Sequence, residues 1–560
     1  MHCTEDLNMK IVSSMEKCFL DDELSKKTVL KSISGLKNEE ISFQIIYKFN
    51  GDINHTPLAI LKVAGELKDH ISIQQVVSVP SNMPINYQSY DDDYIRTKPG
   101  LFPELITPLH YNGKVNLMGG SLGSLWVDVK LTNDIAAGEY ETVFILASED
   151  GRTLGESKIL IEVIDAILPE TDMYHTEWFY ADCLAEYYNV DVFSDRHFEI
   201  IKNYIKTAVD NKINVIMMPV FTPALDTYIG GERLTCQLVK ISRDGNRYNF
   251  DFSLMHRWID ICLECGVKYF EIPPFFSQWG AKNTPKIMAF ENGNYRQIFG
   301  WETDALSDEY RTFLKLFVPA LLNELVSRGI DKRTVFHISD EPDLDDFDRY
   351  SQTTSIIKQL LKDYIMIDAV WDLKIYESGV LSTPVISISE VDRFIEAGAD
   401  NYWVYYCGGH NKKVSNRFFS MPSYRTRILG VQLYHYNAKG FLHWGYNFWH
   451  NRYSYDIINP FLETSGEYFA PSGDTHIVYP AQDGTPYASV RLKLLRDAFQ
   501  DVAALELCER VCGREFVSSL LEEEMGCNFS FTEYPQGSQY IENLRERVNH
   551  AIAKEISNCK

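Results

Sequence analysis

The chain has 560 residues, and because single hydrophobic cores stop growing near ~250 to 300 residues, it is expected to form two or three domains. Its net charge of −24, from 78 acidic and 54 basic residues, disfavours binding to nucleic acid or to anionic membrane surfaces. No stretch reaches the ~18 apolar residues of a membrane span, and the first residues lack a secretory signal, so we expect no membrane insertion and a cytoplasmic location.

The N-terminal part of the chain shows the pattern of β-strands. Short runs alternate apolar and polar residues, as strands with one solvent-exposed face do, and turn residues separate them. These runs are 41–47, 71–77, 124–131, 141–147 and 157–164. The pattern predicts a β-sandwich domain over residues 1–168.

After Leu168-Pro169 the pattern changes to apolar runs that alternate with amphipathic segments of helical spacing, which is typical of a parallel sheet wrapped by helices. The eight apolar runs are 174–181, 215–221, 268–273, 334–339, 364–371, 385–389, 402–406 and 440–448. The clearest helical segments are 197–211, 253–265, 345–361, 391–397, 424–436 and 488–511, with a long helix after Ser307. Eight runs predict a (β/α)8 barrel over 169–512, followed by a C-terminal helical extension over 513–560.

One apolar run, 334–339, leads directly into Asp340, Glu341 and Pro342. Active sites of (β/α)8 barrels lie where the strands end, so acids at this point face the substrate. Adjacent strand residues point to opposite faces, so both acids reach one site only if the strand ends there, which Pro342 favours because it lacks an N–H. Two close carboxyl groups disfavour double ionisation, which provides the acid and the anion that glycoside hydrolysis needs. The alternative is structural: Asp340 caps the next helix and Glu341 lies in its first turn.

The segment Phe336-His337-Ile338-Ser339-Asp340-Glu341-Pro342 resembles the signature of glycoside hydrolase family 123, the β-N-acetylgalactosaminidases. Further segments resemble that family in the same order. They are 125–129, 137–140 and 166–169 of its N-terminal sandwich, 440–446 of its last barrel strand, and 473–480, 489–491 and 495–497, which close its barrel. The order and spacing of these segments make the resemblance specific.

The resemblance implies a retaining exo-glycosidase that removes terminal β-linked N-acetylgalactosamine (GalNAc) by substrate-assisted catalysis through an oxazolinium intermediate. Glu341 would be the general acid and then the base, and Asp340 would hold the acetamido N–H so that the acetamido oxygen attacks C1. The implied substrates are β-N-acetylgalactosaminide glycans or glycolipid headgroups. Two alternatives stay open: a related barrel glycosidase of different sugar specificity, for example β-hexosaminidase-like, and a non-catalytic carbohydrate-binding protein.

Other residues near the predicted carboxyl ends of the barrel strands are candidates for sugar binding. Aromatic rings stack on the C–H faces of sugars, polar side chains bind hydroxyl groups, and 13% of the chain is aromatic. The substrate-binding candidates are Trp178, Asp182, Trp279, His337, Trp371, Tyr405, Trp444, Tyr446 and Asn447. For each of them, packing within the barrel or its helices is the alternative interpretation.

The histidines His435, His443 and His450 raise the question of a metal site. None of them has the ligand spacing of a motif such as HExxH, and the resemblance implies a hydrolase without a metal. The chain also lacks a GxGxxG segment, a phosphate loop and a serine nucleophile elbow. We therefore expect neither a metal nor a cofactor.

Overall fold

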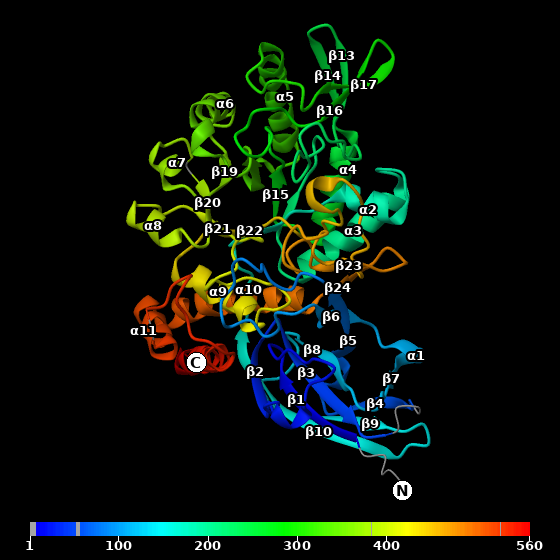
Figure 1. The fold of residues 1–560 in the computed structure, drawn as a ribbon. Helices are drawn as coiled ribbons and strands as arrows, with labels where there is room; N and C mark the ends of the chain where they lie inside the picture. Colours follow the sequence, from blue (N-terminus) through cyan, green and yellow to red (C-terminus); the bar gives the residue numbers. More distant parts are fainter. Residues whose placement is uncertain (1–6, 52–55, 382, 527, 560) are drawn as a thin grey trace. The chain divides into compact units, whose positions relative to one another are not determined.

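The computed structural model describes residues 7–51, 56–381, 383–526 and 528–559 (Figure 1). It contains two compact units. The first comprises Met1–Asp172, Asn411–His435 and Tyr487–Lys560, and the second comprises Met173–His410 and Tyr436–Pro486. The segments 411–435 and 487–512 lie between the predicted boundaries of the barrel but belong to the same unit as the N-terminal sheets. The boundaries at 168 and 512 stay predictions.

The first unit contains two five-stranded sheets in the region where the sequence predicted a β-sandwich. One sheet has the strand order β1 (Leu7–Ser13), β3 (Glu39–Phe49), β8 (Leu122–Leu131), β5 (Ile71–Ser81) and β6 (Gly100–Thr107). The other has the order β2 (Ser32–Lys37), β10 (Thr153–Ile167), β9 (Gly138–Ala147), β4 (Leu58–Ala64) and β7 (Lys114–Asn116). The sheets share one apolar core, in which the rings of Phe43 and Phe144 meet edge to face with centroids 5.7 Å apart. This is the packing of a β-sandwich, and it confirms that part of the predicted fold.

Four helices from later parts of the chain complete the first unit (Figure 1). They are α9 (Tyr424–His435), α10 (Val490–Cys512), α11 (Arg514–Met525) and α12 (Gln539–Cys559). Helix α10 begins at Ser489, whose hydroxyl accepts a hydrogen bond from the backbone N–H of Leu492 and caps the first turn. Ile106 and Trp126 of the sheets share a second core with Leu494 of α10. Both ends of the chain thus build the same unit.

Arg496 on α10 lies at the centre of a buried ion-pair network. Its side chain is 1% exposed, and its guanidinium nitrogens lie 3.2 Å from Asp128 and 2.9 Å from Asp497. Glu40 of β3 is a further partner of the guanidinium. A buried cation with several carboxylate partners fixes how the helix packs on the sheet, because each charge is costly to bury alone.

We expect Arg496→Ala to lower the free energy of unfolding by about 3 to 5 kcal/mol, because it removes a buried cation from the buried carboxylates of Asp128 and Asp497. Arg547 on α12 is the matched control. It is 43% exposed and pairs with two glutamates of α11, so its removal is expected to cost about 0 to 1 kcal/mol. Urea unfolding of the full chain measures both variants. Similar losses for the two would contradict the argument from burial.

The second unit contains a closed barrel of eight parallel strands, which confirms the predicted (β/α)8 fold. The strands are β11 (Tyr174–Glu177), β12 (Val215–Met217), β15 (Tyr269–Ile272), β18 (Thr334–His337), β19 (Ile365–Val370), β20 (Thr383–Ser387), β21 (Trp403–Tyr405) and β22 (Gly440–His443). Each overlaps one of the eight predicted runs. Strand β22 pairs with β11 in parallel register, Tyr174 opposite Gly440, and so closes the barrel. Most strands end earlier than the predicted runs, so several of the aromatic residues that follow lie in loops.

In the part of the second unit that the structure describes there are seven helices, of which α3 and α5 begin at capping serines, Ser194 and Ser307. They are α2 (Ala181–Tyr188), α3 (Asp195–Asp210), α4 (Ser253–Cys265), α5 (Asp308–Ser327), α6 (Phe347–Leu360), α7 (Leu373–Glu377) and α8 (Val391–Glu396). Within the described residues, no helix is both long and apolar enough to span a membrane.

A four-stranded sheet within the second unit was not predicted. Its order is β14 (Arg247–Asp251), β13 (Lys240–Asp244), β16 (Ile287–Glu291) and β17 (Asn294–Phe299). Two hairpins form it, and they turn at Gly245 and Gly293, where the backbone φ is positive. Three further short elements are α1 (His110–Gly113), β23 (Val478–Pro480) and β24 (Pro486–Ala488).

Candidate active site

A pocket of about 220 Å³ opens at the carboxyl ends of the barrel strands. It is lined by Trp178, Asp226, Trp279, Asp340, Glu341, Ala369, Tyr405, Tyr406, Cys407, Gly408, Gly409, Leu442, Trp444, Phe469, Ala470 and Asp474. The rings of Trp178, Tyr405 and Trp444 are buried and form its inner wall, whereas Trp279 is 40% exposed. Trp279 therefore lies where the pocket meets solvent.

Asp340 and Glu341 both reach this pocket because the backbone turns sharply after β18. The strand ends at His337, and Glu341 has a φ of 44°, in the left-handed region that a non-glycine residue rarely adopts. The carbonyl oxygen of Asp340 accepts a hydrogen bond of 2.8 Å from the backbone N–H of Trp279. This turn replaces the alternation of a strand, which would send adjacent side chains to opposite faces. Such strain concentrates at functional sites.

The environment of the pair favours its protonated forms. Burial and the neighbouring Glu341 raise the pKa of Asp340 well above its usual range, against the effect of His337. Burial also raises the pKa of Glu341, although the hydroxyl of Tyr405, which donates a 2.8 Å hydrogen bond to its Oε1, lowers it. Two half-buried carboxyls side by side hold one negative charge more readily than two. The pair can therefore supply an acid and an anion at the same time.

His337 does not line the pocket but lies beneath the acid pair in a charged network. Its Nδ1 is 3.1 Å from Glu271 and its Nε2 is 3.6 Å from Asp368, and all three side chains are buried. Burial alone would lower the pKa of His337, but its interactions with Asp368 and Glu271 outweigh burial and raise the pKa to about 10. Glu271 also accepts a 3.0 Å hydrogen bond from the indole of Trp178, in the pocket wall. The network thus places the positive charge of His337 where it acts on Asp340 of the acid pair.

Two further carboxyl groups line the pocket, and the sequence analysis did not select either. Asp474 accepts hydrogen bonds from the indole N–H of Trp444, at 3.0 Å, and lies 3.2 Å from His443 Nε2. Burial raises the pKa of Asp226 to about 7, although the charge of Arg233 opposes this. Both carboxyls are suited to accept hydrogen bonds from sugar hydroxyls.

The structure brings only part of the predicted substrate-binding set to the pocket. Trp178, Trp279, Tyr405 and Trp444 line it together with the acid pair. The others point elsewhere. These are His337, Trp371, Tyr446, Asn447 and Asp182. The hydroxyl of Tyr446 donates a hydrogen bond to the Tyr204 carbonyl, and Asn447 bonds to the backbone of Tyr180. Trp371, after β19, is 45% exposed.

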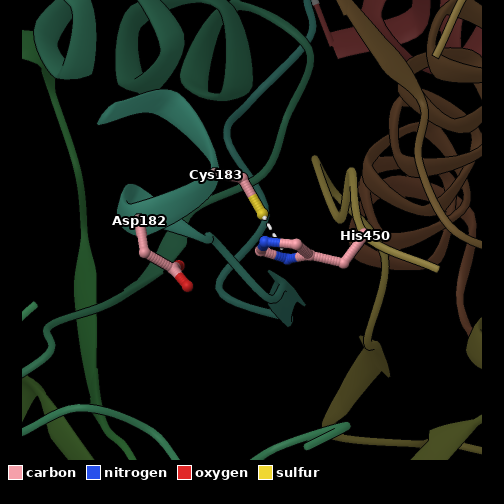
Figure 2. Close-up of side chains that lie close together, drawn as sticks. All are labelled: Asp182, Cys183 and His450. Carbon is pink, nitrogen blue, oxygen red and sulfur yellow. Dashed lines mark hydrogen bonds between the residues drawn. The ribbon is translucent and has the colours of Figure 1, made fainter. Parts of the chain in front are cut away.

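Asp182 belongs to a separate cluster with Cys183 and His450, in which the ligand atoms lie within 4.8 Å of one another (Figure 2). Within the described residues, this is the group that could hold a metal ion. Cys183 Sγ lies 3.3 Å from His450 Nδ1, while Asp182 is 2.5 Å from the guanidinium of Arg233. The buried ion pair keeps Asp182 out of the pocket. We assign the cluster no part in the reaction.

The barrel and its acid pair are arranged as in a known class of enzyme. An eight-stranded barrel with paired acids at the carboxyl ends of its strands is typical of glycoside hydrolases. Residues 178–508 match the family model described as "Glycoside hydrolase 123, catalytic domain". No curated protein matches the chain in sequence. The chain belongs to glycoside hydrolase family 123, which confirms the resemblance found in the sequence, and it is a glycoside hydrolase.

One solved structure has the same fold. A family 123 glycoside hydrolase from Clostridium perfringens, analysed for glycolipid glycan hydrolysis, aligns over 99% of this chain and 98% of its own, with a TM-score of 0.71 and 16% identity. A β-glucuronidase from Parabacteroides merdae aligns over 90% of this chain and 52% of its own, with a TM-score of 0.30 and 11% identity. The first similarity extends over both units, sandwich and barrel.

Proposed function

We propose that this chain is a retaining exo-hydrolase that removes terminal β-linked GalNAc, with Glu341 as acid and base and with the acetamido group of the substrate as nucleophile. The observation that carries the proposal is the adjacent acid pair in one pocket at the carboxyl ends of the barrel strands. The pocket is smaller than the ~300 to 1,000 Å³ of most ligand sites, which favours a single terminal sugar ring. The choice of GalNAc rests on family membership. By the same membership, and because the Clostridium perfringens relative was analysed for glycolipid glycan hydrolysis, glycolipid headgroups are proposed as one substrate class.

The two carboxyls have different tasks in this proposal. Glu341, protonated, donates its proton to the glycosidic oxygen as the bond to C1 breaks, and then accepts a proton from the attacking water. Without substrate, burial and Glu341 raise the pKa of Asp340 well above its usual range, so this assignment requires the bound substrate to shift the proton of the pair to Glu341. The acetamido N–H favours that shift because it donates to Asp340 and stabilises its anion, and the anion stabilises the positive charge that develops on the nitrogen. The acetamido oxygen forms the new bond to C1, so the first intermediate is a cyclic oxazolinium ion. Water opens it from the opposite face, and the configuration at C1 is retained.

The test is a comparison of chromogenic β-GalNAc, β-N-acetylglucosaminide (β-GlcNAc) and β-galactoside substrates with purified full-length protein. Release from β-GalNAc alone supports the proposal. Faster release from β-GlcNAc would identify a related glycosidase of different specificity, and binding of GalNAc without release from any of the three would identify a carbohydrate-binding protein.

The pH dependence of the reaction reports the role of Glu341. The Tyr405 hydroxyl lowers the pKa of Glu341, so Tyr405→Phe is expected to raise it. An acid catalyst loses its proton as the pH rises through its pKa, so the descending limb of kcat/KM should move to higher pH in this variant. A pH–rate profile measures the limb. Tyr402→Phe is the control, since Tyr402 donates to the Tyr436 carbonyl. If the descending limb of the Tyr405→Phe profile stays in place or moves to lower pH, Glu341 is not the acid catalyst.

A further inference from the structure

The opening of the pocket carries aromatic rings that the proposed reaction does not use. Trp279 and Phe469 line the opening, and Tyr453 lies against both of them. The rings of Trp279 and Tyr453 meet edge to face, with centroids 5.9 Å apart, and the Tyr453 and Phe469 centroids are 6.3 Å apart. We call Trp279, Tyr453 and Phe469 the rim cluster. It comes from two loops, one after β15 and one after β22.

The backbone of the rim cluster is held in an unfavourable conformation. Trp279 has a φ of 57°, Tyr453 a φ of 61° and Ser454 a φ of 57°. Bulky residues avoid this left-handed region, and each instance costs about 1 to 3 kcal/mol unless the surroundings impose it. Backbone strain of this kind concentrates at active sites and ligand-binding loops. The rings of Trp279 and Tyr453 are therefore held beside the pocket at an energetic cost, which points to a role in binding.

Hydrogen bonds tie both loops to the acid side of the pocket. The backbone N–H of Trp279 donates to the carbonyl of Asp340, and the Ser454 hydroxyl donates to the carbonyl of Asp226 at 2.8 Å. The Tyr453 carbonyl in turn accepts a 3.1 Å hydrogen bond from the N–H of Tyr228. The rim cluster is thus fixed relative to two of the carboxyl groups that line the pocket. A group that leaves a sugar held in the pocket passes these rings.

We propose that the rim cluster is the binding subsite for the sugar ring on the leaving-group side of the cleaved bond. This inference rests on the proposed exo-hydrolysis, in which the pocket takes the terminal sugar and the rest of the substrate projects through the opening. Flat aromatic rings bind the C–H face of a pyranose.

Polar groups beside the rings favour a sugar over an acyl chain. The guanidinium of Arg452 lies 4.7 Å from the centre of the Tyr453 ring, and Arg452 is exposed. Glu467 is exposed as well, and its carboxylate accepts a 2.8 Å hydrogen bond from Asn451. These groups can bind sugar hydroxyls, whereas an acyl chain would remove them from water without a partner.

The experiment compares three substrates that share a terminal β-GalNAc: one with galactose as the leaving group, one with methanol and one with octanol. In Tyr453→Ala and Trp279→Ala, the ratio of kcat/KM for the galactose substrate to that for the methyl glycoside is expected to fall about ten-fold. Trp279→Phe should restore part of the ratio. Tyr295→Ala is the matched control, because Tyr295 is 51% exposed on β17 and packs against Phe290. Its ratio should equal that of the wild type.

Thermal unfolding of each variant and binding of a galacto-configured thiazoline, which occupies only the pocket, show that the pocket is intact. An unchanged ratio in both variants that bind the thiazoline overturns the subsite. A loss confined to the octyl glycoside overturns it too, since it assigns the rings to an apolar chain. If the wild type releases GalNAc from none of the three substrates, the proposed function fails and the subsite with it. Hydrolysis with an unchanged ratio leaves the proposed function standing and removes only the subsite.

Discussion

Glu341→Gln is expected to reduce turnover of an unactivated GalNAc disaccharide by ~10² to 10⁴-fold, the usual loss when a positioned acid and base is removed. Glutamine keeps the size of the side chain and can still contact Tyr405, but it cannot give a proton to the glycosidic oxygen. Aryl glycosides with acidic leaving groups should lose less, because their departure needs little protonation. Steady-state kinetics on both substrate types measures this difference.

The matched control for this variant is Asp343→Asn. Asp343 is an exposed acid close to Glu341 in sequence, and its side chain caps a short turn rather than lining the pocket. It should keep near-normal rates. A Glu341→Gln protein that is folded and hydrolyses the unactivated disaccharide at a near-normal rate would remove Glu341 from the acid role.

Asp340→Asn is expected to lower kcat by ~10² to 10³-fold while the protein still binds GalNAc, since the loss affects charge that develops in the transition state. An amide cannot supply the anion that stabilises the positive acetamido nitrogen. The wild type should be inhibited by a thiazoline analogue of the cyclic intermediate, and the galacto-configured compound should bind better than the gluco-configured one. Kinetics and inhibitor titration measure these effects.

Two results would contradict this role of Asp340. One is mass-spectrometric trapping of a sugar ester on a protein carboxylate, for which Asp226 and Asp474 are the available neighbours in the pocket. The other is hydrolysis of a 2-hydroxy galactoside as fast as that of its 2-acetamido counterpart. Either would mean that a protein group, and not the substrate amide, attacks C1.

Much of the fold could be predicted because apolar periodicity reports burial directly. The eight barrel strands and the five sandwich runs follow from this signal, and Ser307 marked the capped start of α5. The ends of the strands could not be predicted from this signal. Trp178, Phe179 and Tyr180 after β11, for example, are buried loop residues, and in the sequence they look like a continued strand. The four-stranded sheet was missed because its strands are short and largely exposed.

The site was predictable where a strand end fixes the position of a residue. Asp340 and Glu341 follow β18 directly, and Trp178 and Trp444 follow β11 and β22 in the same way. Asp226 lies within a long loop, where no sequence periodicity indicates the direction of a side chain. Asp474 lay in a segment that resembled the family, but the resemblance gave it no role. Gly408 and Gly409 follow β21, and this position after a strand end could have identified them as residues that line the pocket.

The sheets of the sandwich are synthesised before the barrel, and the helices that complete their core are synthesised after it. Trp126 and Asp128 on β8 emerge from the ribosome long before α10, which brings Leu494 to the same core and Arg496 to the carboxylate. The segments that form the barrel, 173–410 and 436–486, are synthesised in between. Domains generally fold as units and N-terminal ones first during synthesis, but here the early sheets lack their covering helices until the final part of the chain arrives. A chain halted before residue 490 would expose that apolar face, with Asp128 lacking its arginine, and would be prone to aggregate.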